Sequence, residues 1–533
     1  MRSAPLPEDA APGSPRTLNV RRWSLAAALV AAVLYLRTLG YGWVLDDYME
    51  VVLNPFIQSW SNLPRIFGTT VWTGSGMETF LYRPLSQVTF LVNHGVSGLE
   101  PWSYHLANVL LHAGVSVLVV RVGVRWGLPV AAAGLGGVLF ALHPVHVEVV
   151  AAVHGRKDLL ATLFVLGMVL NHARARTEGG PWALLATALF GGALLSKETG
   201  AMGLALVAAA DLLSPARREI LRSPAARGLY AAYASVAVFY LLVRVRVTGT
   251  LGVPDTFVWD NPLVALDFPG RIWSALAVLG MGMGTLVVPA TLSPDYSYDA
   301  IPVATSPLDS RVLLALAMLG LLAWCAVRFR RSHPWVALAV VWYFATLLPA
   351  SNLLVAVGTI FGDRLLYLPS VAFCLAVSGI TYGLYRAARP RVARIAAVAL
   401  VGLLGAGWGL QSARYTGAWR SDIALFEWAV EAVPRSTKAH HKLGEEYLRA
   451  DRPAEALLQL DRALAIAPSN VFAAGTRRQA VERLIQEHAE LFRDPLGASL
   501  PEDRSVLRAL ARLMDDRGRT DAAHRLREAA GSR

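Results

Sequence analysis

Two adjacent carboxylates, Asp46 and Asp47, follow the first long apolar stretch of the chain. Residues 25–42 are long enough to cross a bilayer, and the paired arginines just before them predict a cytoplasmic N-terminus. The two carboxylates then lie on the outer surface, at the lipid interface. Like charges side by side repel each other, so such a pair is typical of proton transfer, metal binding or substrate binding. The alternative is an ordinary helix cap at the membrane edge.

Basic residues also lie where we expect outer turns. The chain has only four lysines, and Lys157 and Lys197 fall in such turns, although basic residues tend to stay in the cytoplasm. Local ion pairs, Lys157 with Asp158 and Lys197 with Glu198, would explain them. We favour a cationic pocket for a phosphate at the membrane surface. This interpretation depends on three further external arginines, Arg83, Arg156 and Arg364.

A third group of polar residues, His143, His146 and Glu148, follows an apolar run. A His-x-x-His spacing with a nearby glutamate could ligate a divalent metal, but three ligands at this spacing are a weak signal. Pro144 also disfavours a regular helix there. We therefore assign the group to hydrogen bonds with a sugar or a phosphate. A metal ion is the disfavoured alternative.

The composition of the chain is typical of a polytopic membrane protein. Hydrophobic residues make up 55% of the chain, and apolar runs recur from residue 23 to residue 410. The formal net charge of +12 would suggest a nucleic-acid partner for a soluble protein. Here the arginines cluster in short gaps between apolar runs, which indicates cytoplasmic loops and no nucleic acid.

The apolar runs define twelve candidate membrane segments. Basic loops follow a strict inside–outside alternation except around 270–288, because the two flanking segments hold one arginine and no lysine between them. We therefore predict that 270–288 is re-entrant or interfacial, with glycines that tolerate a broken helix. The other eleven are predicted to cross the membrane: 23–42, 103–122, 128–142, 158–171, 181–195, 199–213, 226–244, 311–328, 335–350, 364–384 and 392–410.

The chain divides into three parts. Residues 1–22 are predicted to be a disordered cytoplasmic tail. Residues 23–410 form the membrane domain, with a long outer loop at 43–102. Residues 411–533 have a charged composition typical of soluble helices, and their residue spacing fits tetratricopeptide repeats. We predict that this domain lies on the outer side of the membrane. The residues that fit this repeat are Leu443, Gly444, Tyr447, Ala456, Leu460, Ala463 and Pro468.

Several motifs occur in a characteristic order along the chain. They are Leu45-Asp46-Asp47, Asn54-Pro55, Tyr82-Arg83-Pro84-Leu85, Tyr104-His105, Phe140-Ala141-Leu142-His143-Pro144-Val145-His146, Gly155-Arg156, Ser196-Lys197-Glu198 and Asp363-Arg364-Leu365-Leu366-Tyr367. This order resembles the transmembrane and tetratricopeptide-repeat (TMTC-like) protein O-mannosyltransferases of the C-type (GT-C) glycosyltransferase superfamily. The resemblance covers nearly the whole chain, although the repeat array is shorter than in the animal proteins. It implies an all-α fold: a polytopic GT-C membrane domain of about eleven helices and a re-entrant segment, then a short tetratricopeptide-repeat α-solenoid.

The resemblance also implies an activity. A sugar, expected to be mannose, passes from a polyprenyl-phosphate donor in the membrane to Ser or Thr hydroxyls of proteins outside the cytoplasm. Such a reaction needs a carboxylate base, negative charge near an oxocarbenium-like carbon, and cations at the leaving phosphate. We assign Asp46 as the base and Asp47 as the group that orients the acceptor or the sugar. Binding of the donor sugar and phosphate is assigned to Arg83, His143, His146, Glu148, Arg156, Lys157, Lys197, Glu198 and Arg364.

Two other functions remain open. One is a GT-C enzyme that glycosylates a lipid or a cell-envelope glycan, although outer repeats favour a protein acceptor that docks on them. The other is a non-enzymatic membrane scaffold, which would not need so many charged residues on one side. The short repeat array and the scarcity of lysine indicate a bacterium with a GC-rich genome. We therefore expect a multi-pass protein of the bacterial inner membrane, with its active site and repeats extracytoplasmic.

Overall fold

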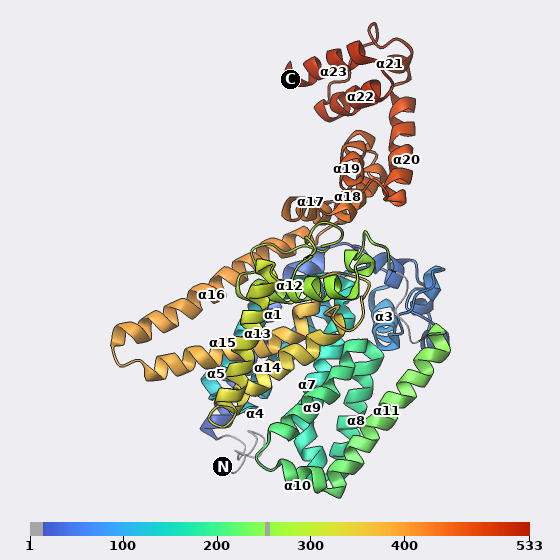
Figure 1. Cartoon of the computed structure of the whole chain (residues 1–533). Coiled ribbons are helices and arrows are strands. Elements are labelled where there is room, and N and C mark those ends of the chain that lie inside the picture. The colour runs from blue at the N-terminus through green and yellow to red at the C-terminus, as the bar shows by residue number, and fades with distance from the viewer. Residues whose placement is uncertain (1–13, 251–255, 533) are drawn as a thin grey trace.

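Helices account for all the regular secondary structure in residues 14–250 and 256–532, the part of the chain that the structure describes. In this computed structural model, a helical bundle is followed by a slender tail that rises from one end of the bundle (Figure 1). We refer to that end of the bundle as the tail end. The all-α prediction is confirmed.

The first helix, α1 (Pro15–Tyr35), begins earlier than the sequence predicted. Ser14 caps it by accepting a hydrogen bond from the Thr17 N–H, and Pro15 occupies the first turn, where its missing N–H costs nothing. Residues 15–22, assigned to a disordered tail, are therefore helical. The same prediction for residues 1–13 falls outside the described part of the chain.

Every segment predicted to cross the membrane contains a helix. The long helices α1, α4, α7, α11, α13, α15 and α16 are accompanied by four shorter ones. Beyond α1, the bounds are α4 (Trp102–Arg125), α5 (Val130–Leu142), α7 (Arg156–Glu178), α8 (Gly180–Ser196), α9 (Met202–Leu213), α11 (Pro224–Thr248), α13 (Ser310–Phe329), α14 (Pro334–Leu347), α15 (Tyr367–Ala387) and α16 (Arg391–Ala418).

Helix length limits how many of these segments cross a bilayer on their own. Among the described residues, seven helices are long and apolar enough to cross, or eight if the bent pair Val130–Leu142 and Pro144–Ala151 is one span. The seven include the helix Phe268–Val287, which was not predicted to cross, and they do not include α15. The helices over Gly180–Ser196 and Pro334–Ala350 are apolar but shorter. A polytopic membrane architecture is thus supported, whereas eleven full-length crossings exceed what helix length supports.

The segment predicted to be re-entrant or interfacial is one continuous helix, α12 (Phe268–Val287), so its glycines do not break it. Near its start, the Ser274 hydroxyl donates to the Ala304 carbonyl, in the loop before α13. Near its end, His143 Nε2 lies 2.9 Å from the Leu286 carbonyl oxygen, just beyond α5. Both ends of α12 therefore contact loops at the tail end of the bundle, where Figure 1 also draws it. The helix is nevertheless long and apolar enough to cross a membrane, so its interfacial position stays a prediction.

Close packing in the bundle depends on small residues. Helix α5 is rich in glycine, and a Cβ at Gly134 would lie within 2.6 Å of the Trp23 ring on α1. A Cβ at Gly137 would lie 2.4 Å from a Val120 methyl group on α4. Backbones that approach this closely gain van der Waals contact, which drives helix association where lipid tails surround the protein. Helix α5 thus fixes the central crossing of α1 and α4.

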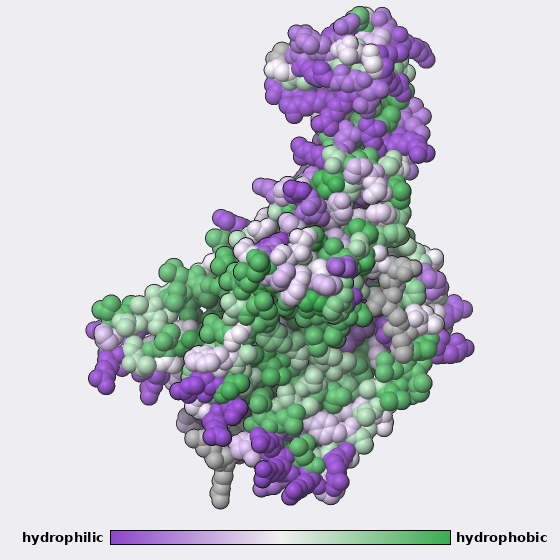
Figure 2. Space-filling model, viewed as in Figure 1, coloured by the Kyte–Doolittle hydropathy of each residue, from purple (hydrophilic) through white to green (hydrophobic). Residues whose placement is uncertain are grey.

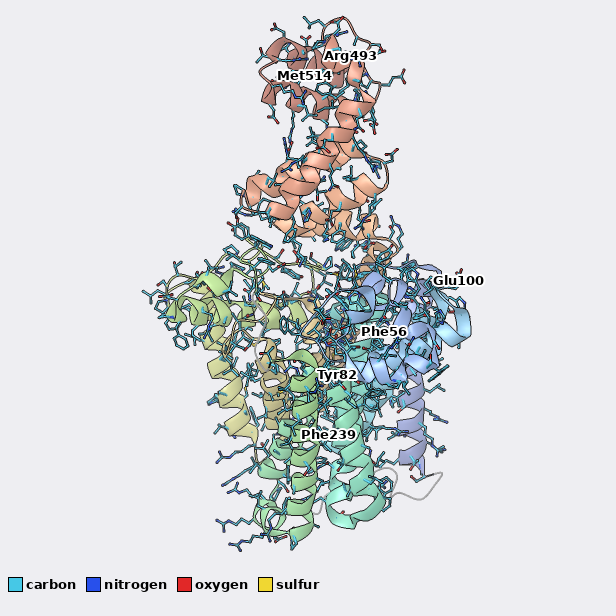
Figure 3. All side chains as sticks on the ribbon, turned by 90° about the vertical axis from the view of Figure 1, so that its right-hand side faces the viewer. Phe56, Tyr82, Glu100, Phe239, Arg493 and Met514 are labelled. Atoms are coloured by element: carbon cyan, nitrogen blue, oxygen red, sulfur yellow. The ribbon has the colours of Figure 1, made fainter. Side chains whose placement is uncertain are left out.

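Apolar side chains form a belt around the bundle. Figure 2 shows hydrophobic residues over the middle of the bundle, and hydrophilic residues over the tail and the opposite end. In Figure 3, Phe56, Tyr82 and Glu100 of the first outer loop lie at the tail end, whereas Phe239 of α11 lies further along the bundle. The loops that the sequence assigned to the outer surface therefore gather beside the tail.

The tail is a succession of helices in which each packs on a neighbour: α17 (Asp422–Ala432), α18 (Thr437–Arg449), α19 (Pro453–Ile466), α20 (Val471–Glu487), α21 (Ala489–Arg493), α22 (Arg504–Asp516) and α23 (Thr520–Ser532). The crossing of α18 and α19 is tight. A Cβ on Gly444 would lie 2.6 Å from the Leu460 side chain, so a glycine is needed there. Both residues are among those that fit the predicted repeat spacing.

Candidate active site

Asp47 is fully buried at the tail end of the bundle, and both of its carboxylate oxygens are hydrogen-bonded. Oδ2 accepts from the backbone N–H of Val44 (3.1 Å) and of Val153 (3.3 Å). Oδ1 accepts from the His154 N–H (2.7 Å) and lies 2.8 Å from the ring Nδ1 of the same residue. Asp47 thus ties the first outer loop to the turn before α7. This geometry favours a structural role over orientation of a substrate.

Asp46 is different, because its side chain is partly exposed. Within residues 14–250 and 256–532, only burial and charge act on its carboxylate, and no hydrogen-bond donor does. Burial disfavours the ionised form, but His154 and Lys157 act against it together with Arg364 and Lys438, and their sum holds the pKa of Asp46 below its ordinary value. Asp46 is therefore an ionised carboxylate with free lone pairs, as a general base requires.

Four ion pairs join the elements around Asp46. They connect the first outer loop, the short helix α6 (Val147–Ala151), the start of α7, the turn η8 (Glu198–Ala201) after α8, and the turn η11 (Asp363–Leu366) before α15. Charges of neighbouring pairs also act on one another, so the four form one cluster. The pairs are Arg364–Glu148 (2.5 Å), Lys157–Glu50 (2.9 Å), Lys197–Asp158 (2.5 Å) and Arg83–Glu198 (2.9 Å).

The local ion pairs considered from the sequence do not form. Lys157 pairs with Glu50 of the first outer loop and not with its neighbour Asp158, and Lys197 pairs with Asp158 and not with its neighbour Glu198. Adjacent residues at the start of a helix point about 100° apart, so they rarely face each other. The cluster thus assembles from segments far apart in the sequence, and its pairs include six of the assigned residues: Arg83, Glu148, Lys157, Lys197, Glu198 and Arg364.

Sequence reasoning missed Glu50 and gave Asp158 no role beyond a local partner. Glu50 and Asp158 are buried, and each has one carboxylate oxygen, Oε2 and Oδ2 respectively, without a hydrogen-bond partner among the described residues. Glu50 lies four residues after Asp46, one helical turn away, which is the signal that could have suggested it. No group of three or more His, Cys, Asp or Glu residues in residues 14–250 and 256–532 has the geometry of a metal site.

Arg364 is the member of the cluster that combines a strong ion pair with access to solvent. Its guanidinium and its backbone N–H both donate to the Glu148 carboxylate, at 2.5 and 3.1 Å. The side chain of Arg364 is nevertheless 31% exposed, whereas Glu148 is buried. Glu148 therefore orients Arg364, and the remaining guanidinium N–H groups are available to an anionic ligand.

Arg156 belongs to a separate, structural network. Its Nε donates to Asn108 Oδ1, its Nη2 to the Tyr104 carbonyl (2.7 Å), and its Nη1 to Asn93 Oδ1 (2.8 Å). The guanidinium also lies over the Phe90 ring, 5.0 Å from its centre. Arg156 is 1% exposed, so it joins α3 (Pro84–Ser97), α4 and α7 and has no surface for a phosphate. The geometry therefore does not support the prediction that Arg156 binds the donor phosphate.

His143 and His146 are also enclosed by protein. The His143 ring lies 4.3 Å from the Trp408 ring, and its Nδ1 accepts from the Val145 N–H, which caps the turn. The His146 ring lies 4.2 Å from Phe140, and its Nε2 contacts the Ser370 hydroxyl at 2.8 Å. Both rings are fully buried, and burial lowers the pKa of His143 to about 4. Their positions favour packing over contact with a sugar or phosphate.

The tail also reaches this region. Lys438 of α18 donates to Asp260 Oδ1 at 2.8 Å and acts electrostatically on Asp46. Burial lowers the pKa of Lys438, but nearby carboxylates outweigh burial and raise it. Trp428 of α17 donates from Nε1 to the Leu292 carbonyl at 2.8 Å. The site is thus bounded by loops of the bundle on one side and by the first tail helices on the other.

Known proteins are similar in sequence to this chain. A sequence profile described as "Protein O-mannosyl-transferase TMTC, DUF1736" matches residues 253–323, the segment that contains α12. Protein O-mannosyl-transferase TMTC4 of Homo sapiens is 30% identical over 473 residues, which cover 79% of this chain. The chain is a TMTC relative. The resemblance inferred from the order of motifs is therefore confirmed.

The TMTC relatives are longer than this chain. The match spans 63% of human TMTC4, and it spans 60% of protein O-mannosyl-transferase F38B6.6 of Caenorhabditis elegans, which is 28% identical over 81% of this chain. Two solved structures align more loosely. The archaeal oligosaccharyltransferase AglB of Archaeoglobus fulgidus aligns with a TM-score of 0.43 at 14% identity, over 80% of this chain and 59% of AglB. ArnT of Cupriavidus metallidurans aligns with a TM-score of 0.40 at 17% identity, over 90% and 81%.

Proposed function

We propose that this chain is an integral-membrane glycosyltransferase of the GT-C class. It transfers a sugar, mannose in our proposal, from a polyprenyl-phosphate donor to Ser or Thr hydroxyls of a protein. The observation that carries the proposal is Asp46: an ionised, partly exposed carboxylate without hydrogen bonds from the described residues, beside Arg364 and Lys157. The names of the relatives, protein O-mannosyl-transferases, support the choice of sugar and acceptor.

The reaction is a single displacement in which each group has a role. The acceptor hydroxyl attacks the anomeric carbon of the donor sugar, and Asp46 removes the hydroxyl proton. The bond between the anomeric carbon and the lipid phosphate oxygen breaks as the new glycosidic bond forms. The negative charge of Asp46 also stabilises the oxocarbenium-like transition state. The products are the glycosylated hydroxyl, a polyprenyl phosphate and a protonated Asp46, which then returns its proton to water.

The leaving phosphate gains negative charge and needs nearby cations. Arg364 is suited to this role, because Glu148 orients its guanidinium and part of the side chain stays exposed. Arg83, Lys157 and Lys197 are more deeply buried and each is paired with a carboxylate. We propose that these three maintain the positive potential around the phosphate, while Arg364 binds it. A lipid-linked donor suits this position because its phosphate stays at the membrane surface.

The protein acceptor is proposed to approach along the tail. Phe257 and Phe472 are exposed, and with Trp259 they form an aromatic patch between the loop before α12 and helix α20; the rings of Phe257 and Trp259 stack 4.7 Å apart. The neighbouring Asp260 binds Lys438, so this patch adjoins the site. Exposed aromatic side chains of this kind are common anchors for polypeptides. We interpret the tail as a short tetratricopeptide-repeat array, residues 411–533, that holds the acceptor.

The membrane and its sides also belong to the proposal. Arginines in the loops at the end opposite the tail suit a cytoplasmic face, so the site and the tail are proposed to be extracytoplasmic. The composition favours the inner membrane of a bacterium, whereas the relatives named above are from a human and a worm. The alternative acceptor, a lipid or a cell-envelope glycan, would use the same site without the aromatic patch.

One assay tests the proposal and its alternatives. The full chain in lipid nanodiscs receives polyprenyl-phosphate mannose labelled in the sugar, together with Ser/Thr-rich peptides and, separately, membrane lipids. Mass spectrometry then locates the label. One hexose on a Ser or Thr side chain is the expected result, and label on lipid would establish the alternative acceptor. Donor that binds but transfers its sugar to neither class would contradict an enzymatic role and favour the scaffold.

A further inference from the structure

The residue before Asp46 has an unusual backbone conformation. Leu45 has φ = 53°, in the left-handed region that a bulky residue such as leucine seldom occupies. A residue persists there only when its surroundings hold it. The conformation of Leu45 sets the direction of the turn that follows, in which the Glu50 N–H donates to the Asp46 carbonyl at 2.8 Å. Whatever holds Leu45 therefore also sets the position of Asp46.

Two carboxylates hold the backbone just before this turn. Asp47 accepts the N–H of Val44 from within the loop. Asp422, the first residue of α17, accepts the N–H of Leu45 at 2.9 Å, across 377 positions of the sequence. Asp422 is 8% exposed, so water competes little for this hydrogen bond. One of the two supports of the turn thus comes from the tail.

The tail helix that carries Asp422 is itself anchored to the bundle. Trp428 of α17 donates to the Leu292 carbonyl at 2.8 Å. In the turn after α17, Ser436 donates to Asp295 Oδ2 at 2.6 Å and Arg435 forms an ion pair with Asp299, both in the loop between α12 and α13. These contacts lie apart from Leu45 and are independent of the Asp422 hydrogen bond. They give α17 a defined place against the bundle, so the Asp422 carboxylate is presented to Leu45 by a fixed element and not by a mobile chain.

We propose that Asp422 is a positioning residue for the catalytic base, and that the first tail helices are therefore part of the active site. This inference rests on the proposed function and adds to it a role for the tail in the chemical step. From the sequence, the repeats were expected only to provide a surface on which a protein acceptor docks. In this proposal, α17 completes the site, and the later tail helices remain free to bind the acceptor.

Substitution of Asp422 tests the proposal through turnover. Asp422→Ala is expected to lower kcat for sugar transfer roughly 10- to 100-fold, the range for loss of a hydrogen bond to a charged group. The donor KM should stay unchanged, because Asp422 does not contact the cluster around Arg364. Asp422→Asn keeps an acceptor oxygen and should be intermediate. The control is Asp516→Ala, on an exposed carboxylate of the tail that pairs with Arg477.

A second substitution separates positioning from general stability. Glycine adopts positive φ without strain, so Leu45→Gly should remove much of the need for Asp422. The double variant Leu45→Gly/Asp422→Ala is therefore expected to regain at least part of the turnover that Asp422→Ala loses. No recovery, at an unchanged melting temperature, would overturn a role through the Leu45 backbone.

Hydrogen exchange gives a readout that does not depend on activity. Deuterium uptake over residues 43–50 should rise in Asp422→Ala and stay at the wild-type level in Asp516→Ala. Equal uptake in the two variants would overturn the proposal. The proposed function fails separately: if Asp46→Asn transfers sugar as well as the wild type, the base is wrong, and the exchange result still decides whether Asp422 holds the turn.

Discussion

The Asp47 carboxylate accepts a hydrogen bond from the backbone N–H of His154 at 2.7 Å and lies 2.8 Å from the imidazole Nδ1 of the same residue. This contact separates the roles of the two adjacent aspartates. The carboxylate of Asp47 accepts hydrogen bonds that hold the fold together. The carboxylate of Asp46 accepts none from the described residues and is partly exposed. Asp47 thus has a structural role, and its neighbour Asp46 is the proposed catalytic base.

Asp47→Asn should lower stability more than Asp46→Asn does. The amide N–H₂ of asparagine would face the N–H groups of Val153 and His154, which are donors as well, and a buried unpaired donor costs about 1–3 kcal/mol. The apparent melting temperature of the purified protein in nanodiscs should fall clearly for Asp47→Asn. Equal melting temperatures for the two variants would show that the Asp47 network contributes little.

Arg156→Ala is expected to act on stability and not on the donor. Loss of its guanidinium leaves Asn93, Asn108 and the Tyr104 carbonyl without their donors, at a cost of about 1.5–3 kcal/mol or more. The melting temperature and the yield of folded protein should fall. Folded protein that remains should use the donor with an unchanged KM. A raised donor KM at normal stability would return Arg156 to the phosphate site.

Arg364→Ala should impair use of the donor. A lost charged hydrogen bond of about 1.5–3 kcal/mol corresponds to a fall of roughly 10- to 150-fold in kcat/KM for polyprenyl-phosphate sugar. Arg364→Lys should recover only part of it, because lysine lacks the planar pair of donors. Arg311→Ala is the control, since Arg311 is also partly exposed but pairs with Asp309 away from the cluster. Equal effects of the two alanine variants would exclude a specific role for Arg364.

Lys438→Met should shift the pH dependence of transfer. Asp46 is active as the base only when deprotonated, so activity is lost as the pH falls through its pKa. Lys438 is one of the cations that lower this pKa; without it the pKa rises, and activity should begin to fall at a higher pH. The measurement is kcat/KM from roughly pH 7 down to pH 4. Lys442→Met, on the same helix but paired with Glu445, should leave the profile unchanged.

Much of the architecture could be predicted from the sequence. The long helices of the bundle fall on the apolar runs, because a backbone in lipid must satisfy its own hydrogen bonds. The charge pattern also singled out 270–288, since the two segments that flank it hold a single arginine between them, and α12 forms there as one continuous helix. Helix lengths were harder to predict, because the apolar runs at α9 and α14 extend into short 3₁₀ turns that are not part of the α-helices.

The site was predictable only as a set of residue types. Asp46, Arg364 and Lys197 were identified because charged residues near lipid are rare and need a purpose. The partners of Lys157 and Lys197 could not be identified, because they lie 107 and 39 positions away and nothing local specifies them. The role of Asp422 could not be predicted from the sequence, because an aspartate in the first turn of a helix is common and needs no further function.

The most direct test of the account is the Asp46→Asn variant. Asparagine keeps the shape of the side chain but cannot accept the proton, so sugar transfer should fall by about 10²- to 10⁴-fold. Melting temperature and binding of the polyprenyl-phosphate donor should remain near the wild-type values. Turnover of labelled polyprenyl-phosphate mannose, measured beside donor binding, separates these effects. A variant that retains half of the wild-type turnover would contradict the assignment of Asp46 as the base and, with it, the proposed mechanism.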